Sequence, residues 1–289
     1  LAPVAGMTRR VRELSATNLD ARVPVPPSGD EIAELAETMN GMLERLENAS
    51  DAQLQFISDA SHELRSPVAS IRAQLETALA YPDDVDWPRV AEIVLAEDDR
   101  LDHLVGNLLA MARLDEGRKG PRTEVDLEDL VLAQARRLTG TTVDVSAVSA
   151  GRVWGNVGEL TSVVRNLTDN AARHAESGVA VRLGPVEDRA GGGAEGATAD
   201  DPVNDVELVV DDDGPGVPVD DRDRIFERFT RLEEARTRDR GGAGLGLAVV
   251  AETVRSLGGT VTVGDSPQGG ARFTVTLPGV AAPREEMSG

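Results

Sequence analysis

The sequence predicts a multidomain protein that combines helical N-terminal domains with an α+β C-terminal domain. Before residue 116, apolar residues recur at alternating steps of three and four, which is the spacing of helices that pack in coiled coils and bundles. After a linker with Gly and Pro at residues 116–121, short apolar strands alternate with helices, which is typical of an α+β domain. Aromatic residues make up only 2% of the chain, which favours helical cores of Leu, Val and Ala.

Residues 1–50 are expected to form two helices joined by an extended connector. Residues 7–19 carry an apolar stripe, whereas residues 20–29 contain three prolines and a glycine and cannot be helical. Asp30 is suited to cap the second helix. Seven of eight seam positions of that helix are apolar, namely Ile32, Leu35, Met39, Met42, Leu46, Ala49 and Phe56, with Gln53 as the exception. Such a seam needs a partner, so the sequence predicts a parallel dimer.

The second helix is expected to continue to about Ala80, and residues 81–84 (YPDD) break it. Another long amphipathic helix is predicted from about Trp87 to Leu114. Two long helices with a short turn form a hairpin, and two hairpins in a dimer would form a four-helix bundle.

The C-terminal part is expected to contain three helices, at about residues 126–137, 157–174 and 248–257. Strands are predicted near residues 143–145, 152–154, 179–183, 206–210, 260–263 and 272–277. The segment 187–205 is rich in Gly, Ala and Asp and lies between two predicted strands. We interpret it as a long, mobile hairpin loop.

Composition excludes several classes of function. The formal net charge of −21 repels phosphate backbones, so nucleic acid is not expected as a partner. The chain contains no Cys, which excludes disulfides, thiolate zinc sites and a Cys nucleophile. No apolar run approaches the ~18–20 residues of a membrane-spanning helix. The chain begins with Leu1 rather than Met, so we interpret it as a fragment.

A first motif, at residues 56–67, is FISDASHELRSP. At about 100° per residue, His62 lies about 200° from the apolar positions Ala60 and Leu64, and therefore on the outer face of the helix. A neutral imidazole is a nucleophile, and Glu63 beside it can accept a proton from one ring nitrogen. Ser66 lies one turn further on, where it can reach the same phosphoryl group or a water. An exposed His alone usually has no role, and we interpret His103 in this way. His62 differs because the residues around it form the motif described above.

A second motif, NLTDNAARH at residues 166–174, places polar side chains on one helical face, because Asn166, Asn170, Arg173 and His174 lie at i, i+4, i+7 and i+8. A third, DDGPG at residues 212–216, follows an apolar strand. Its glycines, Gly214 and Gly216, allow close approach of a planar ligand, and the Asp212 carboxylate can accept a hydrogen bond from an exocyclic amine. Without a ligand, the motif at residues 166–174 would be a solvated helix face, and the motif at residues 212–216 would be a generic turn.

The last two motifs are IFERF at residues 225–229 and GGAGLGL at residues 241–247. Glycines that precede a helix expose backbone N–H groups to phosphate at the positive end of the helix dipole. The segment between them carries several arginines, Arg231 among them, that are candidates for phosphate contacts.

Together, in this order and spacing, the five motifs resemble the H, N, first glycine, F and second glycine boxes of bacterial sensor histidine kinases. The resemblance implies an α/β-sandwich ATP-binding domain of the histidine kinase, gyrase and Hsp90 type. It implies ATP-dependent phosphorylation of His62, transfer to an Asp of a response regulator receiver domain, some phosphatase activity and a homodimer. It also implies Mg²⁺ on Asn170 and adenine on Asp212. The other nucleotide contacts implied are Asn166, Arg173, His174, Gly214, Gly216, Phe226, Arg231, Gly242, Gly244, Leu245, Gly246 and Leu247.

The N-terminal segment also resembles a known module. Pro3, residues 19–23 (LDARV), and the Asp30, Glu31, Leu35 and Asn40 pattern are similar to a HAMP linker. In that family HAMP follows a transmembrane helix, which implies such a segment before Leu1 and a location at the cytoplasmic side of the inner membrane. The expected domains are a HAMP linker (1–50), a dimerisation and histidine phosphotransfer hairpin (51–117) and a catalytic ATP-binding domain (121–289).

Two other classes of function are compatible with parts of this pattern. A hydrolytic ATPase or chaperone shares the nucleotide fold, but such relatives place a Glu four residues before the Mg²⁺-binding Asn to activate water. Asn166 occupies that position here, and an amide is not a general base. A scaffold without kinase activity would only dimerise, and the intact H, N and glycine boxes argue against it.

Overall fold

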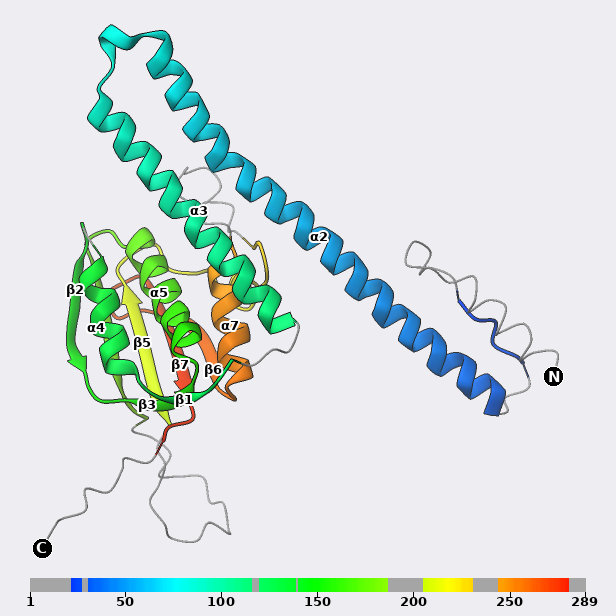
Figure 1. Cartoon of the computed structure of the whole chain (residues 1–289). Helices are drawn as coiled ribbons and strands as arrows, with labels where there is room; N and C mark the ends of the chain where they lie inside the picture. Colours follow the sequence, from blue (N-terminus) through cyan, green and yellow to red (C-terminus); the bar gives the residue numbers. More distant parts are fainter. Residues whose placement is uncertain are drawn as a thin grey trace, which may run out of the picture. The chain divides into compact units, whose positions relative to one another are not determined.

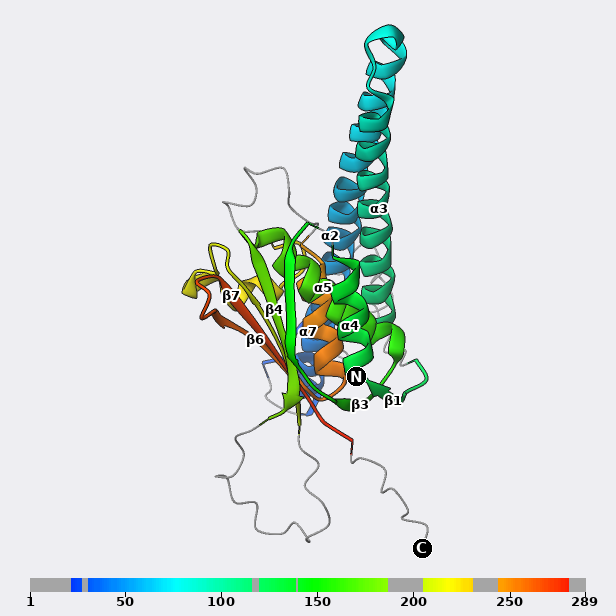
Figure 2. The same cartoon turned by 90° about the vertical axis from the view of Figure 1, so that its left-hand side faces the viewer.

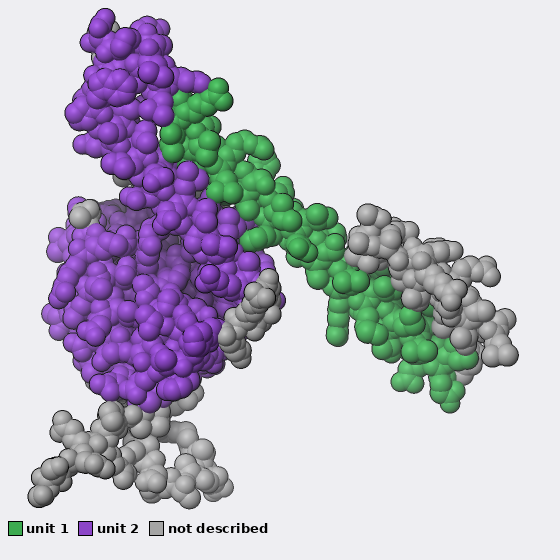
Figure 3. Space-filling view, in the orientation of Figure 1, with its two compact units in different colours: residues 1–73 green, residues 74–289 purple. Residues whose placement is uncertain are grey.

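The computed structural model describes residues 22–27, 31–115, 120–138, 140–186, 205–230 and 244–280. The chain divides into two compact units, residues 1–73 and 74–289, which Figure 3 colours separately. The helix predicted at residues 7–19 and the loop predicted at residues 187–205, except for Asp205, lie outside the described residues.

Two long helices follow one another in the first part of the chain. Helix α2 (Glu31–Ala80) continues through Pro67 and ends one residue before the predicted break. The short 3-10 helix η1 (Pro82–Asp84) and two further residues lead into α3 (Trp87–Asp115). The predicted helices and the break between them are therefore confirmed.

The connector of the N-terminal segment lies against α2. The backbone N–H of Val23 donates to the Asn40 side chain (2.8 Å), and the Asn40 amide donates back to the Val23 carbonyl (3.0 Å). Val23 and Ala36 are buried, with Ile32, Met39 and Leu43 packed around them. The other half of the predicted seam is open: Leu35, Met42 and Leu46 are 54–58% exposed. The connector thus covers one flank of the seam and leaves apolar side chains in need of a partner.

The C-terminal domain is built on a five-stranded mixed sheet in the order β2-β4-β5-β7-β6. Strands β2 and β4 are parallel, and the remaining neighbours are antiparallel. The strands are β2 (Thr142–Val148), β4 (Gly178–Pro185), β5 (Val206–Asp212), β6 (Thr260–Asp265) and β7 (Ala271–Leu277). Strands β4 and β5 pair directly with one another.

Three helices form a second layer on one face of this sheet, which Figures 1 and 2 show from two sides: α4 (Leu127–Arg137), α5 (Val157–His174) and α7 (Gly246–Ser256). A single core lies between the layers, with Leu160, Leu167, Val210 and Phe273 among its buried side chains. The predicted α/β sandwich is confirmed, since a helical layer and a sheet share one core.

One short strand was not predicted from the sequence. Strand β1 (Thr123–Asp126) pairs antiparallel with β3 (Arg152–Gly155) in a separate two-stranded sheet. Only Val125 of β1 is buried, and the other three residues are polar. The strand therefore lacks the alternation of apolar and polar residues by which a strand is predicted. Asp126, predicted to be the first residue of α4, is its N-cap and accepts a hydrogen bond from the Glu128 backbone (3.0 Å).

Candidate functional site

The H box (residues 56–67) lies on α2, in the first compact unit. His62 and Ser66 are exposed, Glu63 and Leu64 are half-buried, and Ala60 is buried. The described residues offer no hydrogen-bond or ion-pair partner to the His62 side chain. The structure therefore has the imidazole on the outer face of the helix, as the helical spacing predicts.

The N box (residues 166–174) forms the second half of α5. The Asn156 side chain starts this helix by accepting hydrogen bonds from Gly158 (2.9 Å) and Glu159 (3.2 Å). Asn170 is half-buried, and within the described residues its amide has no hydrogen-bond partner. Arg173 and His174 are exposed at the C-terminal end. Desolvation of the imidazole lowers the pKa of His174; the Arg173 guanidinium lowers it further, and the Asp212 carboxylate opposes both.

Asp212 ends β5 and is 2% exposed. Its Oδ1 accepts two backbone hydrogen bonds, from Gly214 and from Ala271, each 3.0 Å long. No hydrogen bond to Oδ2 is present among the described residues. One carboxylate oxygen is thus held by the fold, while the other keeps its capacity to accept a hydrogen bond from a ligand.

Glycines bring the N box and the first glycine box together. A Cβ on Gly214 would lie 2.2 Å from the His174 carbonyl oxygen, so only glycine permits this approach. A Cβ on Gly270 would lie 2.2 Å from Asp212 Oδ1. Gly270 is a site residue that the sequence analysis missed; its only signal is a Gly-Gly pair before the last strand. Gly216 has φ +75°, a conformation that glycine adopts without strain.

The F box and the second glycine box are also adjacent. Phe226, in the 3-10 helix η3 (Arg224–Phe226), makes an edge-to-face contact with core Phe273 at 6.5 Å. The Phe229 N–H donates to the Gly244 carbonyl (3.0 Å), and a Cβ on Gly244 would lie 2.8 Å from the Phe229 carbonyl carbon.

The remaining residues of the second glycine box support α7. Leu245 is fully buried, and the half-buried Leu247 packs against the core. A Cβ on Gly246 would lie 2.8 Å from Asn166 Oδ1, which places the start of α7 against the N box. Arg231 and Gly242 lie outside the described residues.

Asp213 links two loops next to the site, a role that was not predicted from the sequence. Its carboxylate accepts hydrogen bonds from the Ser177 hydroxyl and from the backbone N–H groups of Ser177, Gly178 and Glu176, the last at 2.8 Å. The Ser177 hydroxyl and N–H, followed by the other two N–H groups, hold the pKa of Asp213 well below its ordinary value. This carboxylate ties the turn after α5 to the loop after β5.

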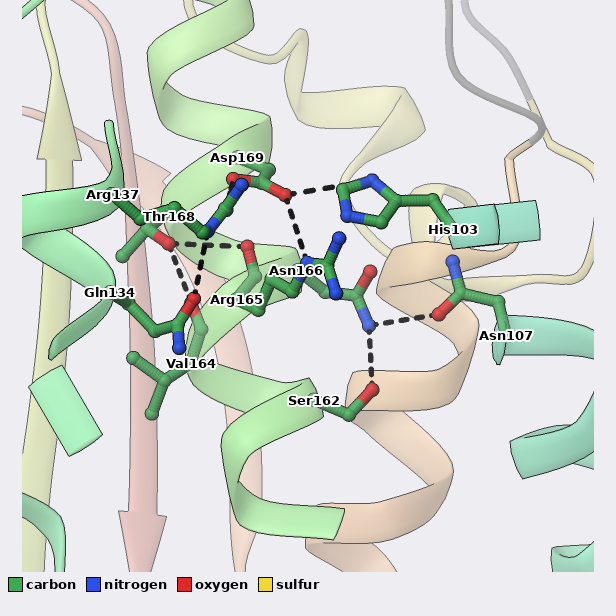
Figure 4. Close-up of polar contacts among 10 residues, drawn as sticks. All are labelled: His103, Asn107, Gln134, Arg137, Ser162, Val164, Arg165, Asn166, Thr168 and Asp169. Carbon is green, nitrogen blue, oxygen red and sulfur yellow. Dashed lines mark hydrogen bonds and ion pairs between the residues drawn. The ribbon is translucent and has the colours of Figure 1, made fainter. Parts of the chain in front are cut away.

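Helix α3 contacts the N-box helix within the second compact unit (Figure 4). The Asn166 amide donates to Asn107 Oδ1 and to Ser162 Oγ, both at 3.2 Å. His103 Nδ1 lies 3.8 Å from Asp169 Oδ2, and Asp169 also pairs with Arg137 and Arg165.

His103, which the sequence led us to interpret as a histidine without a role, is half-buried, and its Nε2 is buried without a hydrogen-bond partner among the described residues. Desolvation lowers the pKa of His103, and Arg165 lowers it further. Nothing local predicts this, because the neighbours of His103 come from α4 and α5.

Among the described residues, no group of three or more His, Asp and Glu side chains is arranged to hold a metal ion. None of the described helices combines the length and hydropathy of a membrane span.

Three family models match the chain in succession. The HAMP domain matches residues 1–48, the His Kinase A (phospho-acceptor) domain matches residues 52–117, and the histidine kinase-, DNA gyrase B- and HSP90-like ATPase matches residues 155–281.

Relatives share this organisation. The chain is 33% identical over 305 residues to the signal transduction histidine-protein kinase/phosphatase MprB of Mycobacterium tuberculosis, covering 100% of this chain and 57% of MprB. It is 35% identical over 285 residues to the sensor protein CutS of Streptomyces coelicolor, covering 96% of this chain and 65% of CutS. The chain thus spans only part of the length of these relatives.

A solved structure shows the same fold. The histidine kinase AdeS of Acinetobacter baumannii matches with a TM-score of 0.55 and 20% identity, over 75% of this chain and 97% of AdeS. With the three family models in order along nearly the whole sequence, the chain belongs to the bacterial sensor histidine kinases that carry a HAMP domain.

Proposed function

We propose that this chain phosphorylates its own His62 with ATP and Mg²⁺, and then passes the phosphoryl group to an aspartate of a response regulator receiver domain. The observation that carries the proposal is the presence, in one chain, of an exposed H-box histidine and of N, F and glycine boxes packed against one another. A helix with an accessible imidazole supplies the acceptor, and the C-terminal domain supplies the nucleotide site.

The chemistry requires a neutral imidazole in line with the γ-phosphate. A ring nitrogen of His62 forms the N–P bond, and the bond from phosphorus to the β,γ-bridging oxygen breaks, so that ADP leaves with the electron pair. Glu63 accepts the proton of the other ring nitrogen. In the second step the phosphoryl group moves from His62 to a carboxylate oxygen of the regulator, and the imidazole is restored.

Two of the proposed nucleotide contacts use polar atoms that have no partner among the described residues. Asp212 Oδ2 accepts from the adenine amine, while Oδ1 stays with Gly214 and Ala271. Asn170 offers its unpaired amide oxygen to Mg²⁺, which usually takes one or two protein ligands and completes its shell with phosphate oxygens and water. Bound there, Mg²⁺ would neutralise phosphate charge. In this proposal Arg173 and Arg231 contact the phosphates. The backbone around Gly242 and Gly244 also binds them.

The proposal also includes three domains, namely a HAMP linker (1–50), a phosphotransfer hairpin (51–117) and an ATP-binding domain (121–289). It further includes a homodimer as the active form. Besides the open seam of α2, the long helices expose large apolar side chains such as Leu54 (64%), Leu79 (72%) and Leu95 (64%). Covering them in a four-helix bundle would remove this surface from water. We also propose that the chain lies on the cytoplasmic side of the membrane, anchored by a segment before Leu1, and the match to the HAMP domain supports this.

The proposal is tested by the chemical stability of the label. After incubation with ATP labelled on the γ-phosphate and Mg²⁺, we expect one phosphoryl group per acceptor site that is lost in acid and retained in alkali, as for a phosphoramidate. A label that resists acid would indicate a phosphoserine. Release of phosphate with no protein-bound label would favour a hydrolytic ATPase instead.

Phosphatase activity is expected to depend on Ser66. Removing a regulator's aspartyl phosphate needs an aligned water, and the exposed Ser66 hydroxyl lies one turn from His62, where it can hold that water. Ser66→Ala should slow dephosphorylation of a purified phosphorylated regulator by at least about tenfold, with autophosphorylation retained. Ser58→Ala is the matched control, because Ser58 is also exposed and lies one turn before His62. Equal rates for wild type and Ser66→Ala would remove this role.

A further inference from the structure

One N-box residue takes part in two different contacts. The polar face that carries Asn170 and Arg173 continues along α5 to Asn166, and Asn166 is also where α3 meets α5 (Figure 4). Both hydrogens of the Asn166 amide are used, one on Asn107 Oδ1 and one on Ser162 Oγ. Its Oδ1 faces Gly246 at the start of α7. In this arrangement neither amide hydrogen of Asn166 is left to donate to a phosphate group.

The contact of α3 has further components on both sides of Asn107. One turn earlier, His103 faces Asp169 at 3.8 Å. At the end of α3, Asp115 pairs with Arg228 of the F box through both of its carboxylate oxygens. Helix α3 also packs on α7, and Leu104 and Met111 are the buried side chains of α3 in this part of the structure. The contact therefore reaches the N box, the F box and the helix that follows the second glycine box.

We propose that α3 and the bound nucleotide compete for Asn166, so that the α3 contact holds the kinase in a state of low nucleotide affinity. The inference rests on the proposed function, which assigns Asn166 to the nucleotide site, and adds a regulatory partner for it within the same chain. For Asn166 to turn toward the phosphates, its amide must leave Asn107. Binding of nucleotide and the α3 contact then oppose each other, and by linkage each weakens the other by the same factor.

Asn107→Ala in the full chain tests the competition. The substitution removes the acceptor on α3, leaves every proposed nucleotide contact in place, and puts a better helix former on a helix surface. Calorimetric titration with the non-hydrolysable analogue AMP-PNP and Mg²⁺ should show about fivefold tighter binding, the factor for loss of one hydrogen bond of ~1 kcal/mol. His103→Ala, which weakens the same contact without touching Asn166, should shift affinity in the same direction. Asp98 is an exposed residue of α3, and Asp98→Ala should leave the nucleotide affinity unchanged.

A double-mutant cycle identifies the mechanism. When Asn166 is already replaced by Ala, the further change Asn107→Ala should have no effect, because the shared side chain is gone. A persistent effect would overturn the competition for Asn166, and so would equal or weaker binding by Asn107→Ala in the wild-type background. If neither the wild type nor the variants bind AMP-PNP, the proposed function fails and the inference falls with it.

Discussion

His62→Gln is expected to abolish phosphorylation of the chain. Glutamine has a similar length and a polar end, but its amide nitrogen is not a nucleophile, so no N–P bond can form. The variant should still fold, because His62 is exposed and has no partner within the described residues. It should also bind nucleotide as the wild type does, because the nucleotide contacts come from the C-terminal domain.

The measurement is protein-bound label after incubation with labelled ATP and Mg²⁺, with circular dichroism and nucleotide titration to establish folding and binding. His103→Gln is the matched control, since His103 is the other histidine on a long helix of this chain. That variant should keep its label. Substantial labelling of His62→Gln would assign the acceptor to another residue.

Asp212→Asn is expected to weaken nucleotide binding by about 1.5–3 kcal/mol, or roughly one to two powers of ten in Kd. The substitution is nearly isosteric. The Asn oxygen can replace Oδ1 and continue to accept from Gly214 and Ala271. The amide nitrogen then occupies the position of Oδ2 and presents a donor to the adenine amine, which is itself a donor. A favourable charge-assisted bond becomes a repulsive contact.

Asp211→Asn separates this effect from a general loss of stability. Asp211 precedes Asp212 on β5, so its side chain points to the opposite face, where it pairs with Arg182 (2.9 Å) and Arg272 (2.7 Å). Its substitution should lower the melting temperature and leave nucleotide affinity close to that of the wild type. Calorimetry that shows unchanged affinity for Asp212→Asn would contradict the adenine contact.

Local sequence patterns were sufficient to predict most helices and strands and the positions of the five boxes on them. The break after Ala80 follows from the sequence YPDD at residues 81–84, in which Pro82 removes a backbone donor and disfavours helical backbone at Tyr81. The exposure of His62 follows from helical periodicity relative to Ala60 and Leu64. These features depend on residues within a few turns of one another, so they are readable from sequence order.

Strand β1 and the surroundings of Asp212 were not readable in this way. Four residues with one buried side chain form a strand only because β3 lies beside them. Which oxygen of Asp212 stays free depends on Ala271, 59 residues away in the chain. Gly270 must be glycine for the same reason, since only the folded chain brings it against that carboxylate.

The sequence by itself determined the fold class and the order of the boxes, and it singled out His62 as the proposed acceptor, because each depends on side-chain type and local spacing. Only the tertiary structure decided that Asn166 faces Asn107 and that His103 is half-buried against Asp169. The physical reason is that helix surfaces of mixed polarity can pack in many ways. The choice among them comes from the sum of contacts between segments that are distant in the chain.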